Sequence, residues 1–134
     1  MRIDGNCFCG SISYEADIDP VQISICHCTD CQQFTGSTYR VTVLAPAQAI
    51  RLTQGAPKTF VKTADNGNHS VQHFCGDCGS PIFYSSADDP AGEWGIRWGS
   101  IRQRAELEPR RQIWLGSAAA WIHDLAQLPA RIAD

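Results

Sequence analysis

Every cysteine in this sequence lies within three residues of another cysteine, in a C-x-C pair, a C-x-C-x-x-C run and a C-x-x-C pair: Cys7 and Cys9; Cys26, Cys28 and Cys31; Cys75 and Cys78. Two thiolates on one short loop can bind the same metal ion, with Zn–S bonds of about 2.3 Å. A disulfide within C-x-C would close a small strained ring. Seven thiols also cannot all pair within one chain. The pattern therefore predicts zinc binding.

Seven ligands divide naturally into a closed site and an open one, because a structural zinc has four protein ligands and a catalytic zinc has three. In the division we prefer, one six-residue stretch supplies the open site and two remote loops supply the closed site: Cys26, Cys28 and Cys31; Cys7, Cys9, Cys75 and Cys78. A rival division closes a different set of four and leaves another three: Cys26, Cys28, Cys75 and Cys78; Cys7, Cys9 and Cys31. Spacing alone does not exclude the rival.

An open site of three cysteines favours thiol chemistry. Three thiolates against the +2 of zinc give a formal charge of about −1, so this ion is a weaker Lewis acid than one held by three histidines. It suits a thiolate from a substrate better than hydroxide, which places hydrolysis second. If a helix begins at Thr29, Cys31 lies in its first turn, where free N–H groups stabilise a thiolate. His27 is expected to pack or hydrogen-bond rather than to act in catalysis.

The elements that must position these cysteines are mostly β-strands, because alternating apolar and polar residues recur between turn signals. Nine strands are predicted, at residues 11–16, 22–26, 38–45, 50–53, 58–63, 70–74, 82–85, 95–98 and 111–115. One short helix is expected at residues 29–34, with Thr29 as N-cap and Gln32 completing a capping box. A second is expected at residues 118–125. This spacing indicates a mainly β fold, a sandwich or coiled sheets.

The composition is that of one small globular domain, which we expect to span residues 1–134. Hydrophobic residues make up 43% of the sequence, enough for a core. The net charge of −3 argues against a basic nucleic-acid-binding face. No apolar run approaches the roughly 20 residues of a membrane span, and the first residues do not form a secretion signal. We therefore expect a cytoplasmic protein in a reducing compartment, with neither nucleic acid nor membrane as a partner.

Three segments resemble a known family: Gly5-x-Cys7-x-Cys9-Gly10; Cys26-His27-Cys28-x-x-Cys31; Phe74-Cys75-x-x-Cys78-Gly79-Ser80. In order, spacing and flanking glycines they are similar to the glutathione-dependent formaldehyde-activating enzymes (GFA), which are related to the centromere protein V domain. The stretch Phe34-Thr35-Gly36-Ser37, residues 109–114 and Trp121 also resemble this family. The likeness uses all seven cysteines and covers nearly the whole chain.

The resemblance implies coiled antiparallel sheets and two zinc ions. It supports our preferred division, matching one set of cysteines to the structural zinc and the other to the catalytic zinc: Cys7, Cys9, Cys75 and Cys78; Cys26, Cys28 and Cys31. The implied activity is that of a carbon–sulfur lyase acting on an adduct of an aldehyde with glutathione or a similar thiol, as in S-(hydroxymethyl)glutathione synthase. We expect the three-cysteine site to lose metal first and to be part-occupied, because it has one ligand fewer.

Two other functions compete with the lyase. A non-enzymatic zinc module that binds a thiol ligand or a protein partner predicts a buried three-cysteine site with no adjacent cavity. A redox or zinc-buffering protein predicts reversible oxidation among the cysteines of the same site. Three arginines could contact the carboxylates of glutathione, but surface arginines are common, so we assign them no role: Arg40, Arg97 and Arg102.

Overall fold

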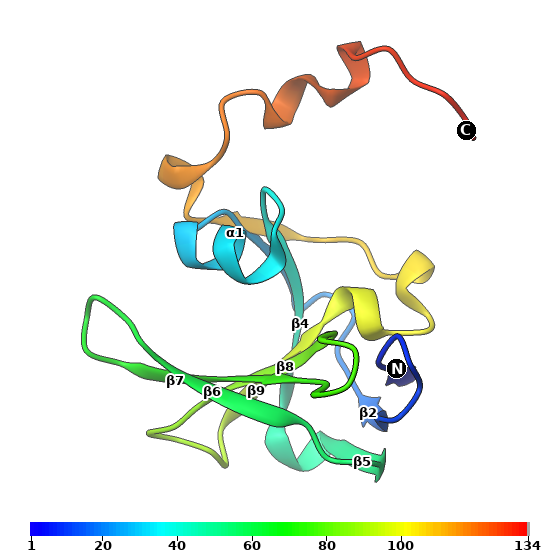
Figure 1. Ribbon diagram of the computed structural model, residues 1–134, viewed down its shortest axis with the longest axis vertical. Helices are drawn as coiled ribbons and strands as arrows, with labels where there is room; N and C mark the ends of the chain where they lie inside the picture. The colour runs from blue at the N-terminus through cyan, green and yellow to red at the C-terminus, as the bar shows by residue number, and fades with distance from the viewer. Residues whose placement is uncertain (134) are drawn as a thin grey trace.

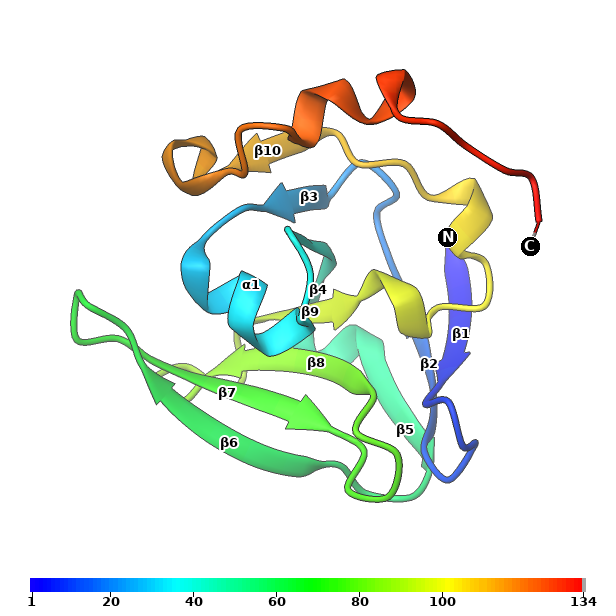
Figure 2. The ribbon, with the colours of Figure 1, turned by 45° about the horizontal axis from the view of Figure 1, so that its top comes forward.

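The computed structural model describes residues 1–133, in which ten strands form two sheets (Figure 1). The smaller sheet has the order β1-β2-β5: Arg2–Asn6, Ser13–Asp17 and Ile50–Gln54. The larger sheet has the order β10-β3-β4-β9-β8-β7-β6: Arg111–Ile113, Ile23–Cys26, Arg40–Pro46, Glu93–Arg97, Pro81–Ser86, His69–Phe74 and Lys58–Thr63. Figure 2 shows the larger sheet curving from β10 and β3 to β7 and β6, with helix α1 (Thr29–Thr35) between these two ends.

Each of the nine predicted strand ranges overlaps an observed strand, and residues 58–63 coincide with β6. Strand β1 is not predicted by the alternation. Its two buried positions are Ile3 and Gly5, and glycine gives no apolar signal. Gly5 is required because a Cβ there would lie 2.3 Å from the Tyr14 hydroxyl, on the neighbouring strand β2. The close packing of Tyr14 therefore removes the sequence pattern that would have revealed β1.

The larger sheet is mixed. Strand β10 runs parallel to β3, with Gln112 opposite Ile25, whereas the other strand pairs of residues 1–133 are antiparallel. The expected antiparallel sheets are therefore confirmed, with a parallel pair at this edge. Parallel neighbours need a long connection instead of a hairpin. Here the connection from β3 to β10 contains most of the chain. It places β10, the last strand, beside Cys26 at the end of β3.

The hydrophobic core is built from both sheets. Tyr14 of β2 and Phe83 of β8 pack edge to face with ring centroids 4.9 Å apart, and both are almost fully buried. Ile3, Val43 and Ile96 join them, each with at most 1% of its surface exposed. Because burial of apolar surface is the main favourable term in folding, this contact holds the two sheets together. It thereby fixes the loops that carry the cysteines.

The helices are short. Helix α1 begins at the predicted residue, but its N-cap is Cys28, whose Sγ accepts a hydrogen bond from the Cys31 N–H at 3.3 Å. The predicted capping box is therefore wrong: the Gln32 amide donates to the carbonyl of His27 instead, at 2.9 Å. The predicted helix at 118–125 is a 3-10 helix displaced toward the C-terminus, η5. The 3-10 segments η1 to η5 are Ala47–Ala49, Trp98–Ser100, Arg104–Glu106, Leu115–Ser117 and Ile122–Gln127.

The segment after β10, orange to red in Figure 1, runs along the outside of the molecule. Trp114 and Trp121 in this segment are more than half exposed. Within residues 1–133, none of the helices combines the length and the apolar character that crossing a bilayer requires.

Candidate metal centres and an adjoining cavity

The first cluster joins two loops that are far apart in the sequence. Cys7 and Cys9 lie between β1 and β2, and Cys75 and Cys78 lie between β7 and β8. All four sulfurs lie within 4.8 Å of one another, with Cys9 Sγ 3.6 Å from Cys7 Sγ and 3.7 Å from Cys75 Sγ. Four sulfurs placed tetrahedrally around zinc at about 2.3 Å are about 3.8 Å apart. The four-cysteine cluster therefore fits a closed zinc site.

Hydrogen bonds hold the two loops of the four-cysteine cluster in this geometry. The Phe8 N–H donates to Ser80 Oγ at 2.9 Å, which links one loop to the other. Gly79, at a φ of 79°, turns the second loop so that its N–H donates to the Cys75 carbonyl at 2.8 Å. Ser80 also hydrogen-bonds Cys78 at 3.2 Å and lowers the pKa of that thiol to about 6. Cys78 is therefore mainly a thiolate at neutral pH, the form that binds metal.

The second cluster lies where β3 meets α1. Cys26 ends the strand, Cys28 caps the helix and Cys31 lies in its first turn; their sulfurs also lie within 4.8 Å of one another. All three residues are half-buried. With three sulfurs and no fourth residue in the group, the three-cysteine cluster fits an open zinc site. The structure thus groups the seven cysteines as in our preferred division and does not bring the rival sets together.

Within the three-cysteine cluster, the pKa values of Cys26 and Cys31 are shifted in opposite directions. A hydrogen bond from the Cys31 side chain is the main cause that lowers the pKa of Cys26 to about 5. The same bond, together with burial, raises the pKa of Cys31. At the start of α1 the Cys31 backbone N–H donates to Cys28 Sγ rather than to the Cys31 sulfur.

His27 belongs to neither cysteine cluster. Its hydrogen bonds to β10 fix the loop that carries the three-cysteine cluster. It is 1% exposed, and its Nε2 is 2.8 Å from Gln112 Oε1 of β10. The His27 N–H donates to the Ile113 carbonyl at 3.1 Å. Gln32 adds a bond to the Ser117 carbonyl at 3.0 Å. The late part of the chain therefore fixes the cysteine loop by several hydrogen bonds, and the expectation that His27 packs and hydrogen-bonds is confirmed.

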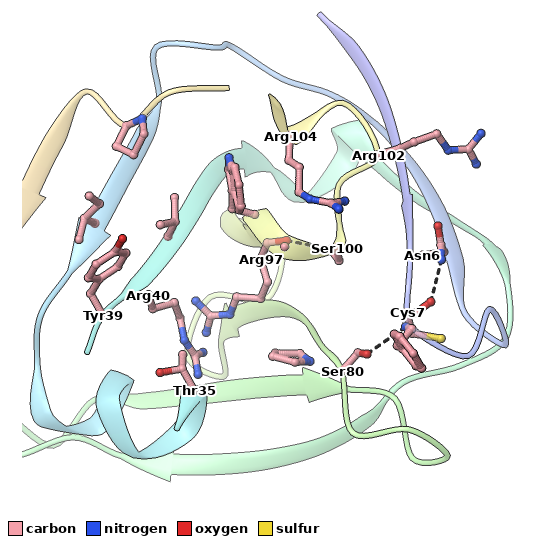
Figure 3. Close-up of a pocket in the computed structure, with 17 residues that line it drawn as sticks. Asn6, Cys7, Thr35, Tyr39, Arg40, Ser80, Arg97, Ser100, Arg102 and Arg104 are labelled. Atoms are coloured by element: carbon pink, nitrogen blue, oxygen red, sulfur yellow. Dashed lines mark hydrogen bonds between the residues drawn. The ribbon is translucent and has the colours of Figure 1, made fainter. Parts of the chain in front are cut away.

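A cavity of about 780 Å³ reaches the four-cysteine cluster and, through Arg40, the residue opposite Cys26, comes near the three-cysteine cluster, whose own cysteines do not line it. Its wall includes Cys7 of the four-cysteine cluster, and Ile25 and Thr35, which flank the three-cysteine loop. It also includes four arginines and no acidic residue: Arg40, Arg97, Arg102 and Arg104. In Figure 3, Arg40 and Arg97 extend toward each other near the middle of the view, whereas Arg102 lies at its edge. A cavity of this size accommodates a small-molecule ligand.

Arg40 and Arg97, which had no predicted role because surface arginines are common, are in fact buried: they are only 5% and 7% exposed. Val43 and Ile96 lie on the core face of the large sheet, and Arg40 and Arg97 lie on its other face. The alternation of apolar and polar residues along β4 and β9 therefore suggests that the two arginines are surface residues. Helix α1 covers this face, and nothing in the local pattern of β4 or β9 indicates that cover. The one indication of a role for Arg40 is its position directly opposite Cys26 in the register of β3 and β4.

The fold and the two clusters define a class of protein: mainly β, with cysteine loops that could hold two metal ions. Residues 2–117 match the family described as glutathione-dependent formaldehyde-activating enzyme (GFA). The chain therefore belongs to the GFA family, as the cysteine motifs predicted.

Among solved structures, a crystal structure of a Rhodobacter sphaeroides protein is similar, with a TM-score of 0.62 and 18% sequence identity. The match covers 81% of this chain and 98% of that chain. At this identity the likeness supports the fold alone. A comparison with curated proteins gives no match.

Proposed function

We propose that this protein is a zinc-dependent carbon–sulfur lyase that acts on an adduct of an aldehyde with glutathione or a similar thiol. The observation that carries the proposal is a group of three cysteines, one ligand short of a tetrahedron, beside a cavity. GFA membership supports an enzyme of this kind. A reducing, cytoplasmic location and a single domain over residues 1–134 are part of the same proposal.

Different roles are proposed for the two clusters. Cys26, Cys28 and Cys31 hold the catalytic zinc, and the four-cysteine cluster holds a structural one. When bound, zinc supplies a Lewis acid that keeps a coordinated thiol in its thiolate form near neutral pH. The half-buried cysteines leave this position accessible from solvent. Burial lowers the pKa of the Arg40 guanidinium, an effect that the nearby sulfurs of the three-cysteine cluster partly offset, and the Arg40 charge in turn stabilises negative charge beside the cluster.

The bond changes of the proposed reaction balance without any further reactant. In the lyase direction the adduct hydroxyl loses its proton, the C–O bond becomes a carbonyl, and the C–S bond breaks with its electron pair on sulfur. The released sulfur leaves as a thiolate and takes up the proton. In the reverse direction the thiolate adds to the aldehyde carbon, and the resulting alkoxide is protonated.

The cavity also favours this function over a non-enzymatic zinc module. Such a module predicts a buried three-cysteine site with no adjacent space. The cysteines are instead half-buried, and the cavity wall includes their sequence neighbours Ile25 and Thr35.

The test is an exchange measurement by NMR of formaldehyde and glutathione with their adduct, at a rate above the spontaneous one. Cys28→Ser is the matched control, because serine still caps a helix but removes one thiolate. We expect catalysis by the wild type and none by the variant. Metal analysis should find two zinc ions per chain in the wild type and one in the variant. Equal rates for both proteins with several aldehydes would contradict the lyase activity.

A further inference from the structure

Arg40 and Arg97 are two buried cations on adjacent strands beside the three-cysteine cluster. Arg40 of β4 lies opposite Cys26 of β3, and Arg97 of β9 lies opposite Thr42, two residues further along β4. Residues opposite each other in antiparallel strands have Cβ atoms about 5 Å apart on the same face of the sheet. The two arginines therefore share the face that carries Cys26.

Neutral groups hold both guanidinium groups. Gln72 Oε1 accepts from Arg40 Nη1 at 3.1 Å and from Arg97 Nη2 at 2.7 Å. Arg97 Nη1 donates to Thr42 Oγ1 at 2.9 Å. The Phe34 ring lies 5.6 Å from Arg40, and the Tyr84 ring lies 5.0 Å from Arg97. The arrangement positions the two cations but leaves their charges without an anionic side chain.

The position of Tyr84 depends on Gly95. A Cβ at Gly95 would lie 2.2 Å from the Tyr84 ring and 2.6 Å from the Thr42 methyl group. Only glycine at position 95 therefore allows Tyr84 to pack across β9. The Tyr84 ring then lies against Arg97, two residues after Gly95 on the same strand. The surroundings of Arg97 are thus built by several strands rather than by one flexible side chain.

No carboxylate among residues 1–133 pairs with either of these positive charges. Neither arginine takes part in the ion pairs of residues 1–133, and each has a buried Nε with no hydrogen-bond partner. Burying charge without an opposite charge is costly. Burial, with the nearby Arg40 charge, lowers the pKa of Arg97 to about 9. In a chain of net charge −3, the cavity wall has four arginines, of which Arg102 is paired with Asp4, and no acidic residue, which is a local excess of positive charge.

We propose that Arg40 and Arg97 bind a carboxylate of the substrate, so that the enzyme prefers thiols that carry a carboxylate a few bonds from sulfur. This inference rests on the proposed function and narrows its substrate class. Two guanidinium groups side by side offer planar pairs of N–H donors that match a carboxylate. The rival role, in which the arginines only balance the charge of the cysteine thiolates, predicts no preference between neutral and anionic thiols.

The test compares 3-mercaptopropionate with 3-mercapto-1-propanol, which have the same chain length and differ in charge. Binding to the zinc-loaded full chain is measured by calorimetry. We expect the wild type to bind the carboxylate at least about 10-fold more tightly, as a charge-assisted contact predicts. In Arg40→Met and in Arg97→Met the two thiols should bind within about twofold of each other.

Arg102→Met is the matched control, because the Arg102 side chain is 71% exposed at the cavity rim and pairs with Asp4. This variant should keep the wild-type preference. A wild type without preference would overturn the proposal, as would a preference that survives in both Arg40→Met and Arg97→Met. Melting temperature and zinc content identify a variant that does not fold, and the two substitutions are independent tests of the same prediction.

Propionate separates the failure of this inference from the failure of the proposed function. It carries the carboxylate but has no thiol, so its binding does not depend on thiol chemistry. Its binding is followed through the fluorescence of Trp98, which lines the cavity. If neither thiol binds but propionate does, and Arg40→Met abolishes that binding, the anion site stands and the lyase does not. If the thiols bind without preference and propionate does not bind, the anion site is wrong.

Discussion

The two cysteine clusters differ in how the chain builds them. The four-cysteine cluster joins two loops that are far apart in the sequence and takes part in the core, with Cys7 and Cys75 at most 1% exposed. The three-cysteine cluster comes from one strand-to-helix junction and lies half-buried beside a cavity. The first arrangement constrains distant segments, whereas the second leaves a ligand position accessible. The same residue type therefore suits stability in one place and chemistry in the other.

The strongest test of this comparison is to remove one sulfur from each cluster. Cys75→Ser should lower the melting temperature by at least about 10 °C, because the bound metal contributes to the folding free energy. Cys28→Ser keeps the helix cap and should lower it by less than about 3 °C while abolishing activity. Calorimetry and the adduct-exchange assay measure the two effects. Equal loss of stability in the two variants would remove the distinction between the clusters.

Metal removal should separate the clusters next. A chelator titrated into the zinc-loaded protein should first take one zinc per chain, with loss of activity and an unchanged circular dichroism spectrum. The second zinc should need at least about 10-fold more chelator, because a closed site has one more ligand, and its release should unfold the protein. Release of both ions in one step, together with unfolding, would contradict this order.

A smaller effect is expected from the hydrogen bond between His27 and Gln112. Gln112→Ala leaves a buried ring nitrogen unpaired, which costs roughly 1–2 kcal/mol, or about 4–7 °C of melting temperature. The three-cysteine cluster should also lose zinc more easily, since its loop is held by this contact. Arg111→Ala, an exposed change on the same strand, is the control and should alter neither quantity. Equal zinc affinity in both variants would show that β10 does not support the cluster.

The smallest effect concerns the ion pair between Asp30 of α1 and Lys62 of β6, whose atoms are 2.7 Å apart. A partly exposed pair of this kind contributes about 0.5–1 kcal/mol. Asp30→Asn should therefore lower the melting temperature by about 2–4 °C without loss of zinc. Lys62→Met should produce the same change, and the double variant should add little, as a double-mutant cycle would measure. Additive losses would show that the two residues act independently.

Local patterns in the sequence predict the features that depend on neighbouring residues. Alternation locates β6 and most other strands, and cysteine spacing favours one group of Cys26, Cys28 and Cys31 without excluding the rival division. The start of α1 is also predicted, although its cap is a cysteine rather than a threonine. The sulfur of Cys28 accepts the N–H bond that the sequence analysis assigned to a hydroxyl.

Features that depend on distant packing could not be predicted. Strand β1 shows no apolar alternation, because its buried position Gly5 has no side chain and so leaves room for Tyr14. The parallel pairing of β10 with β3 joins segments with no shared local signal. Arg40 and Arg97 are buried by a helix and by strands from elsewhere in the chain, so their own strands look solvent-exposed. The cavity, which depends on all of these contacts, is therefore the part of the site that only the structure reveals.

The different construction of the clusters also orders events during synthesis. Cys26 to Cys31 leave the ribosome as one six-residue stretch and are complete as a set early. The four-cysteine cluster must wait for Cys78, and the support from β10 arrives still later. Because local contacts form before distant ones, a nascent chain completes the three-cysteine cluster before the four-cysteine cluster can assemble.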